Sequence, residues 1–213
     1  MRPPGRLLAL LRRAVPRIAR SCGRGAAVVE LGSGSRRKTE LLLAALDLPA
    51  VYVPIDVSAQ FLGQSVRGLR TRFPRLAVDP LVADFTHPQA LRGAAARVAH
   101  ATHGQRLAFF PGSTIGNLTP QAATALLGHI GQALGRGTLL VIGADATQDP
   151  ALLIPAHDDS LGVTAAFNKN LLVRVNRELG SNFELGRFEH QARWNAGPRR
   201  IEMHLVARVT HEV

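Results

Sequence analysis

Five short apolar runs, separated by segments with helical periodicity, constrain the fold more than any other feature of this chain. The runs are rich in Val, Leu and Phe and are almost uninterrupted by polar residues, as is typical of strands buried on both faces of a sheet. They span residues 26–31, 50–55, 75–82, 106–111 and 138–143. Alternation of strands and helices predicts an α/β fold with a parallel sheet, whose ligand site lies at the carboxyl ends of the strands.

Helical spacing is clearest over residues 36–46 and 58–73 and in the segment that follows Thr119. Thr119 and Pro120 form a typical helix start, because the hydroxyl caps the first turn and proline fits the first helical position. The face of this helix that we expect to be buried carries Leu126, Leu127, Ile130 and Leu134.

The pattern changes after the fifth apolar run. A helix is predicted to begin after Asp149, and a longer one is predicted over residues 163–179. Residues 181–195 are polar and we expect them to be irregular, whereas residues 199–210 alternate apolar and polar side chains like a half-buried strand. Because no further segment follows to return the chain, we expect this strand to lack its partners.

Positive charge is concentrated before the first acid, Glu30. The chain has 26 Lys and Arg against 15 Asp and Glu, a formal net charge of +11, and seven of the arginines precede Glu30. Such a segment suits contact with nucleic acid or a membrane. Arginine bias with only two lysines, Lys38 and Lys169, equally reflects coding composition. We favour this second interpretation and predict no nucleic-acid and no membrane partner.

The amino-terminal segment also bears on the compartment. It is too short and too charged to span a bilayer and has no clear signal-peptide cleavage pattern. Its arginine-rich, acid-free character resembles a mitochondrial transit peptide, which we rank below a cytoplasmic location. The single cysteine, Cys22, cannot form an internal disulfide or a cysteine metal cluster. No histidine spacing indicates a metal site, so we predict no metal.

A glycine turn follows the first apolar run, in the stretch VVELGSGSRRKTE of residues 28–40. Gly32 and Gly34 let the backbone approach a ligand closely. A full G-x-G-x-x-G motif would predict a dinucleotide at the helix start, but Arg37 occupies the third glycine position. The order acid, x, Gly, x, Gly, with Glu30 as the acid, is usual in S-adenosylmethionine-dependent methyltransferases. On this motif alone, a purely structural turn stays equally open.

Acidic residues also end the second and third apolar runs. Asp56 lies 22 residues after Gly34, the distance at which a carboxylate can accept hydrogen bonds from ribose hydroxyls. Asp84 and Phe85 suit an adenine, with the carboxylate accepting from its amino group and the ring covering it; by itself, Asp84 could equally cap a helix. Signals at three consecutive strand ends together predict a bound adenosyl group.

Longer motifs carry a resemblance to a known family. These motifs are FFPGSTIGN (109–117), GVTAAFNKNLL (162–172), VNRELGSNF (175–183) and RRIEMHL (199–205). Together with ELGSGSRRKT and YVPIDVS, they extend the resemblance from about Val28 to about Ala207. In these segments the chain resembles the histidine-specific Nα-methyltransferases, which make hercynine, the precursor of ergothioneine. The resemblance implies trimethylation of the α-amine of L-histidine or a related amino acid by S-adenosylmethionine. We expect the chain to be a monomer.

The resemblance also implies a domain organisation. The family combines a Rossmann-like methyltransferase domain with a smaller substrate domain. We therefore expect a basic amino-terminal segment over residues 1–24, a Rossmann-like domain that binds S-adenosylmethionine over 25–147, and a partial substrate-binding subdomain over 148–213.

Individual positions match the family's site residues. Those implied to bind the cofactor, with the second glycine of the turn added, are Gly32, Gly34, Lys38, Asp56, Asp84 and Phe85. Asn117 falls on the asparagine that holds the substrate carboxylate, although a buried asparagine capping its own turn is an alternative. Met203 matches a residue that lines the imidazole pocket, and a core methionine is equally open.

The chain departs from the family pattern in three places. His157 stands where the family has a tyrosine that grips the substrate carboxylate; histidine has a shorter reach and a charge that depends on pH. The family's amino-terminal substrate segment has no counterpart in residues 1–24, and its Glu-x-Ser segment and last strands, which follow the RIEM strand, are absent. The chain thus resembles a family member truncated at both ends, with an exposed sheet edge expected. The alternative function is a non-catalytic homologue that only binds the cofactor.

Methyl transfer from a sulfonium is an in-line displacement that needs alignment and an unprotonated amine. No general base is evident from the sequence, because Asp158, Asp159 and Glu202 are candidates only by charge and structural roles are favoured for them. A nucleic-acid methyltransferase, suggested by the basic segment, is a weaker hypothesis because no aromatic-rich surface is visible.

Overall fold

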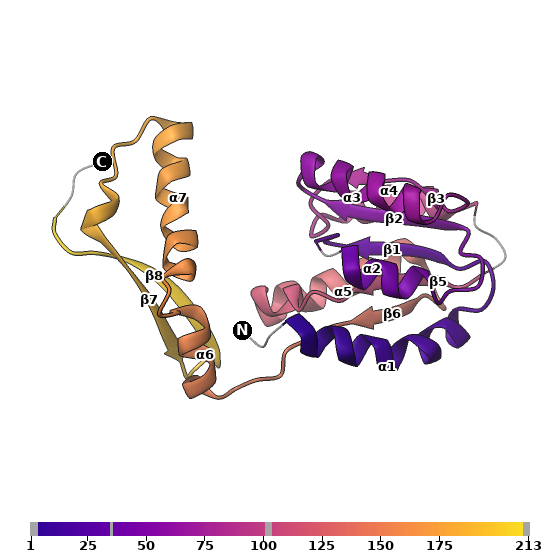
Figure 1. Ribbon diagram of the computed structural model, residues 1–213, viewed down its shortest axis with the longest axis horizontal. Coiled ribbons are helices and arrows are strands. Elements are labelled where there is room, and N and C mark those ends of the chain that lie inside the picture. Colours follow the sequence, from indigo (N-terminus) through magenta and orange to yellow (C-terminus); the bar gives the residue numbers. More distant parts are fainter. Residues whose placement is uncertain (1–3, 35, 101–103, 211–213) are drawn as a thin grey trace. The chain divides into compact units, whose positions relative to one another are not determined.

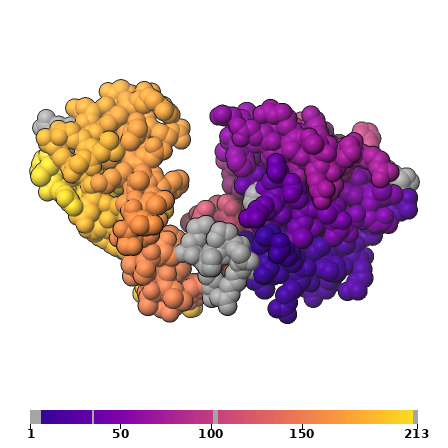
Figure 2. All heavy atoms as spheres, viewed as in Figure 1, coloured from indigo at the N-terminus to yellow at the C-terminus, as the bar shows by residue number. Residues whose placement is uncertain are grey.

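The computed structural model describes residues 4–34, 36–100 and 104–210 of the chain. It divides into a first unit, Pro4–Asp145, and a second unit that begins at Ala146. Helices and strands of each unit are shown in Figure 1, and the atoms of each unit are closely packed in Figure 2.

A parallel sheet forms the centre of the first unit. Its strands are β1 (Ala27–Leu31), β2 (Val51–Asp56), β3 (Ala77–Val78), β4 (Leu81–Val82), β5 (Arg106–Phe110) and β6 (Leu139–Ile142). The strand order is β3-β2-β1-β5-β6, with β4 also paired to β2, and every pairing is parallel. The predicted α/β fold with a parallel sheet is therefore confirmed. The chain order reverses between β1 and β5, where an open sheet leaves a crevice at its carboxyl edge.

The third predicted strand, residues 75–82, is interrupted in the structure. Ala77 pairs with Val51 and Leu81 pairs with Ile55, so β3 and β4 both lie along β2. Between them stands Pro80, which has no N–H to donate to the sheet. The result is two short strands at the same edge.

Helices cover both faces of this sheet. They are α1 (Pro4–Cys22), α2 (Arg36–Leu43), α3 (Ala59–Arg72), α4 (Pro88–Val98) and α5 (Pro120–Leu134), with a short 3-10 turn η1 (Thr114–Asn117) before α5. Apolar residues of α1, α2 and α3 share one core cluster with Val28 and Phe109 of the sheet. Those of α4 and α5 share the other cluster with Val29 and Phe110. The alternation of neighbouring strand residues between the two clusters makes this a three-layer unit.

Helix α1 was not expected from the basic composition of residues 1–24. Leu11 and Val15 are buried against the core, whereas Arg12 and Arg13 face solvent. The spacing of four between the two apolar residues gives the helix one buried face. Much of the basic segment is thus part of the first unit.

Two predicted helix starts are confirmed, with one error on a buried face. The hydroxyl of Ser58 accepts a hydrogen bond from Phe61 N at 3.2 Å and caps α3, and Thr119 caps α5 through Ala122 N at 3.2 Å. Leu127 was expected on the buried face of α5 but is 38% exposed, because it lies at the margin of a stripe that Leu126, Ile130 and Leu134 fill.

The second unit consists of two helices and an antiparallel hairpin. Its elements are α6 (Pro150–His157), α7 (Val163–Leu179), a 3-10 turn η2 (Leu185–Arg187), β7 (Phe188–Asn195) and β8 (Arg200–Ala207). The expectation that residues 181–195 are irregular was wrong for β7, which pairs with β8 along its whole length. The strand over residues 199–210 therefore has a partner, which precedes it in the chain.

Neither a membrane span nor a metal cluster occurs in the described ranges. Within residues 4–34, 36–100 and 104–210, no helix combines the length and apolar character that crossing a bilayer requires. In the same ranges no three His, Cys, Asp or Glu side chains converge as metal ligands.

Candidate functional site

The glycine turn lies at the carboxyl end of β1, beside the point where the strand order reverses. Gly32 has φ of +70°, which favours glycine, and its N–H donates to Ile55 O of β2 at 3.0 Å. A Cβ at Gly32 would stand 3.4 Å from the ring of Phe85. Gly34 N donates back to Gly32 O at 2.7 Å, which closes the turn. The turn thus meets both β2 and the segment after β4.

Beneath this turn lies a buried acid. Glu30 is 1% exposed, and its Oε2 accepts hydrogen bonds from Tyr52 Oη at 2.6 Å and from Thr39 Oγ1 at 2.7 Å. The hydroxyl of Ser33, which is in the turn itself, lies 3.3 Å from Tyr52 Oη. A polar cluster therefore joins β1, β2, α2 and the glycine turn.

Burial dominates the ionisation of this cluster. It raises the pKa of Glu30 from 4.5 to about 7, although the hydrogen bonds from Tyr52 and Thr39 and the charge of Lys38 act in the opposite direction, and Asp56 adds to the rise. The pKa of Tyr52 is raised well above its usual value, first by burial and then by the nearby Glu30. Glu30 consequently gains or loses its charge near neutral pH.

The predicted ribose ligand, Asp56, ends β2 next to the turn. Its Oδ1 accepts a hydrogen bond from Ser58 N at 2.9 Å, and within the described part of the chain its Oδ2 has no hydrogen-bond partner. One carboxylate oxygen is therefore available at the carboxyl edge of the sheet.

Asp84 and Phe85 follow β4 at the same edge. Asp84 Oδ1 accepts from Thr86 N at 2.9 Å and from Thr86 Oγ1 at 2.7 Å, and these two bonds lower its pKa. Asp84 orders a turn before α4, whose own N-cap residue is His87, so it is not the helix cap. The ring of Phe85 meets that of Phe110 edge to face, with centroids 5.4 Å apart.

Asn117 ends η1, in the connection between β5 and α5. It is exposed, and among the described residues no side chain or backbone group is hydrogen-bonded to its amide. The alternative of a buried asparagine that caps its own turn is therefore wrong. Ser113, just before η1, has φ of 60°, and its hydroxyl accepts from Asp145 N at 2.9 Å. This contact ties the ends of β5 and β6 together.

The predicted substrate residues His157 and Met203 belong to the second unit. His157 is the last residue of α6, and its Nδ1 lies 2.9 Å from Leu153 O. Because a carbonyl oxygen only accepts, Nδ1 carries the hydrogen and Nε2 is the nitrogen left for a ligand. That Nε2 can donate a hydrogen bond only when the ring is protonated.

A buried histidine supports the backbone of His157. Asn168 Nδ2 donates to His190 Nδ1 at 2.9 Å and to His204 O at 3.2 Å, so Nδ1 of His190 is an acceptor. His190 Nε2 then carries the hydrogen and donates to His157 O at 2.7 Å. Sequence reasoning found no role for His190 or Asn168, because the contact spans 33 residues of chain.

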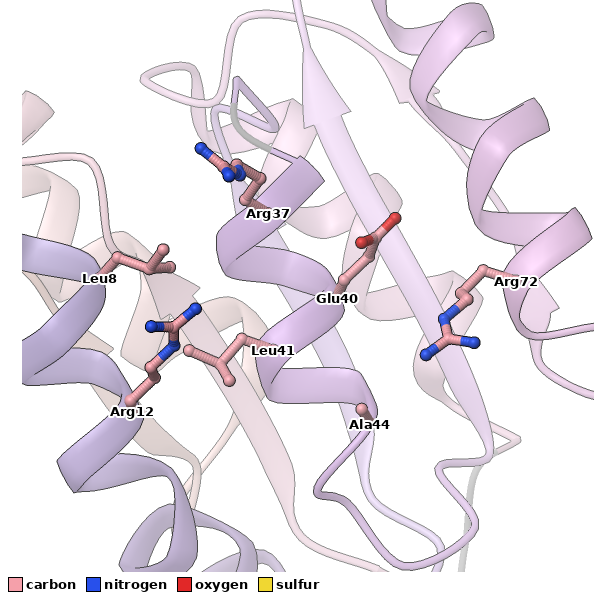
Figure 3. A pocket seen from close by; sticks show the side chains of 7 residues that line it. All are labelled: Leu8, Arg12, Arg37, Glu40, Leu41, Ala44 and Arg72. Carbon is pink, nitrogen blue, oxygen red and sulfur yellow. The ribbon is translucent and has the colours of Figure 1, made fainter. Parts of the chain in front are cut away.

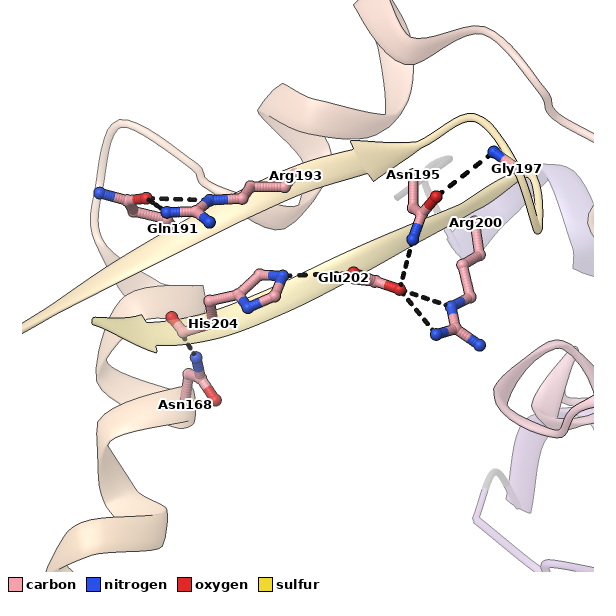
Figure 4. Close-up of polar contacts among 8 residues, drawn as sticks. All are labelled: Asn168, Gln191, Arg193, Asn195, Gly197, Arg200, Glu202 and His204. Atoms are coloured by element: carbon pink, nitrogen blue, oxygen red, sulfur yellow. Dashed lines mark hydrogen bonds and ion pairs between the residues drawn. The ribbon is translucent and has the colours of Figure 1, made fainter. Parts of the chain in front are cut away.

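Two carboxylates considered as bases have structural partners. Glu202 accepts from Arg200 Nε at 2.8 Å and from Asn195 Nδ2 at 3.1 Å on the hairpin, and these contacts lower its pKa (Figure 4). Hydrogen bonds from the Thr164 side chain and from the backbone N–H groups of Thr164 and Val163, at the start of α7, lower the pKa of Asp159 to about 2. Carboxylates held in this way are poor proton acceptors at neutral pH.

Met203 is 42% exposed on β8, so the alternative of a core methionine is wrong.

The residues that sequence reasoning missed in the first unit are Thr39, Tyr52 and Ser33. Each contacts Glu30 directly or through one hydroxyl, and only the position of Glu30 before the glycine turn signalled the cluster.

Comparison with known proteins gives consistent matches. A family model described as histidine-specific methyltransferase, SAM-dependent, matches residues 7–213. A histidine N-alpha-methyltransferase of Mycolicibacterium smegmatis is 40% identical over 189 residues, which cover 87% of this chain and 56% of that protein. A protein of the same name from Mycobacterium tuberculosis is 37% identical over 203 residues, 93% of this chain and 60% of that protein. Ergothioneine biosynthesis protein 1 of Neurospora crassa is 30% identical over 159 residues, 73% of this chain and 18% of that protein. The chain thus spans less than two thirds of the length of these relatives.

Proposed function

This chain belongs to the family of histidine-specific, S-adenosylmethionine-dependent methyltransferases, and on that premise we propose that it transfers methyl groups to the α-amine of L-histidine. Hercynine, the precursor of ergothioneine, is the proposed product. We further propose that the chain acts as a cytoplasmic monomer on this small molecule, without a nucleic-acid or membrane partner.

The observation that carries the proposal is the meeting of Gly32, Asp56 and Phe85 at the carboxyl edge of the sheet. A Cβ at Gly32 would be in van der Waals contact with the Phe85 ring. Asp56 directly follows Ile55, whose carbonyl oxygen accepts a hydrogen bond from the N–H of Gly32. An adenosyl ligand needs such a close backbone approach, a carboxylate for its ribose and an apolar ring for its base. The described side chains fit these requirements.

The proposed cofactor roles follow from these positions. S-adenosylmethionine supplies a methyl group activated by a sulfonium. We assign its ribose to Asp56, its adenine to Asp84 and Phe85, and its amino-acid portion to Gly32, Gly34 and Lys38. In the charged state, Glu30 beneath the turn adds a negative potential that favours a cationic ligand. Residues 25–147 form the proposed cofactor domain.

We assign the substrate to Asn117 and to residues of the proposed partial subdomain, 148–213. The free amide of Asn117 donates to the substrate carboxylate, and Met203 lines the space for the imidazole. His157 donates from Nε2 only as imidazolium, because Leu153 O takes the hydrogen of Nδ1. Because a carboxylate only accepts hydrogen bonds, this contact requires the imidazolium form of His157, while the reacting amine must lose its proton.

A turnover assay tests the proposed function. Purified chain is incubated with S-adenosylmethionine and L-histidine, and mass spectrometry resolves mono-, di- and trimethylated histidine. The proposal expects all three products in order of appearance and none with an Asp56→Ala variant. Cofactor binding without methylated product would support the alternative, a non-catalytic homologue.

A further inference from the structure

The helices on one face of the sheet carry most of the positive charge of the first unit. Helices α1, α2 and α3 contain ten arginines and one lysine but only one acid, Glu40. Helices α4 and α5, on the opposite face, contain two arginines. The excess is thus a property of a single helical layer, which the composition of the whole chain does not reveal.

Within this layer a cleft of about 300 Å³ is bordered by α1, α2 and α3 (Figure 3). Each helix contributes one arginine, and these are Arg12, Arg37 and Arg72. Figure 3 shows Arg12 and Arg72 reaching toward α2 from the two sides. Leu8 and Leu41 add an apolar part to the lining. We call this place the arginine cleft.

The three guanidinium groups are not neutralised by neighbouring acids. Within the described residues, no carboxylate lies within ion-pair distance of Arg12, Arg37 or Arg72, and Arg72 has only the ring of Phe73 at 6.0 Å. Glu40, the one acid of the lining, is paired with Arg36 at 2.9 Å. Three like charges around one cleft repel each other, and an anion removes that repulsion.

We propose that the arginine cleft binds a small oligophosphate, either inorganic or the phosphate chain of a nucleotide. Guanidinium groups match phosphate oxygens with paired N–H donors, and three of them on separate helices suit several linked phosphates better than a single carboxylate. The volume lies at the lower limit of small-molecule sites, which suits a phosphate chain. The lining of the cleft shares no residue with the proposed cofactor site, and this inference does not depend on the proposed function.

The test is calorimetric titration of the whole chain with sodium tripolyphosphate and, in parallel, with ATP. We expect one site per chain for tripolyphosphate, with affinity that falls as salt is raised, since the contacts are charged and partly exposed. Equal affinities for the two ligands would assign recognition to the phosphates alone, and tighter binding of ATP would assign part of it to the nucleoside. Absence of binding by both would overturn the proposal.

Two triple variants separate a local site from general charge. In the first, Arg12, Arg37 and Arg72 are replaced by Gln, and the affinity is expected to fall at least about tenfold. In the matched control, the exposed residues Arg75, Arg92 and Arg136 are replaced by Gln, which removes the same charge and should change the affinity less than about twofold. Equal losses in the two variants would overturn the proposal.

A single substitution should strengthen binding. Glu40→Gln removes the only carboxylate of the cleft and releases Arg36, so we expect the affinity for tripolyphosphate to rise about fivefold. Damage to the fold cannot produce such a gain. Duplex RNA and anionic vesicles are tested in the same way. If either binds the chain more weakly after the three cleft arginines are replaced, and tripolyphosphate does not bind at all, the cleft recognises a macromolecular partner and the proposal of a small anion is wrong.

Discussion

Replacing Glu30 with Gln should change how the stability of the protein depends on pH. Glu30 is buried, and burial raises its pKa from 4.5 to about 7. At pH values between 4.5 and about 7, Glu30 keeps its proton in the folded protein but has released it in the unfolded chain. The free energy of unfolding therefore falls as the pH rises through this window and is then level above it.

The size of the effect follows from the two pKa values. They differ by about 2.5, and each step of one corresponds to about 1.4 kcal/mol, which gives a destabilisation of about 3 to 4 kcal/mol when Glu30 is fully charged. Gln has the same shape and keeps an oxygen to accept from Tyr52 and Thr39, but it cannot ionise. The Glu30→Gln variant should lack this pH-dependent loss.

The assay is urea denaturation of both proteins from about pH 5 to about pH 8, the range over which most of the difference develops. Subtracting the two curves removes the contribution of every other titratable group that the two proteins share. Glu178→Gln is the matched control, because Arg174 lowers the pKa of that exposed carboxyl to about 2 and its charge is constant over the range. It should leave the slope unchanged.

We take the free energy of unfolding of the unsubstituted protein minus that of the Glu30→Gln variant. A difference that stays flat or rises with pH would refute the reasoning about Glu30. The same variant loses a negative charge beneath the glycine turn. We therefore expect it to bind the cationic cofactor more weakly at about pH 8 while being more stable there, a trade-off common at functional sites.

Three further substitutions test other parts of the account. Asn117→Ala should change the free energy of unfolding by less than about 0.5 kcal/mol, because its amide is exposed, but should raise the KM for L-histidine at least about tenfold in steady-state assays. His157→Ala should raise the KM for L-histidine at least about fivefold, since it removes the hydrogen-bond donor at Nε2; an unchanged KM would exclude His157 from substrate binding. Gly143→Ala should destabilise the first unit by about 2 kcal/mol or more in urea denaturation, because a Cβ there would collide with the backbone of Pro111, and a change near zero would contradict this close approach.

The sheet could be predicted from the sequence because its strands are short apolar runs with few polar interruptions. All five runs contain strands of the observed sheet, and β1 is buried at every position. The break in the third strand at Pro80 could also have been predicted from the sequence, because proline has no N–H to donate to the sheet. Sheet order and the contacts of Leu127 depend on packing, which no single segment encodes.

Two elements were missed although a signal was present. Leu8, Leu11, Val15 and Ile18 recur at helical spacing in α1, but the arginines between them dominated the composition. In β7, Phe188 and His190 are buried at alternate positions, as in a strand with one buried face. The polar residues around them led to the wrong prediction of an irregular segment. Periodicity was therefore more informative than polarity in both segments.

The candidate site was predictable at the strand ends and not beyond them. Gly32 and Asp56 follow apolar runs directly, so parallel strands must bring them to one edge. The partnership of Glu30 with Tyr52 could not be predicted, because it depends on the register that places Val28 opposite Tyr52. The single available nitrogen of His157 depends on a backbone carbonyl one helical turn away.

The central claim is that the carboxyl edge of β1, β2 and β4 binds S-adenosylmethionine. Isothermal titration of this compound into the purified chain and into Asp56→Asn measures it directly. The account predicts one site per chain and an affinity at least about tenfold lower in the variant, since a charged acceptor of ribose hydrogen bonds is lost. No heat at millimolar concentrations with folded protein, or equal affinity in both proteins, would contradict it.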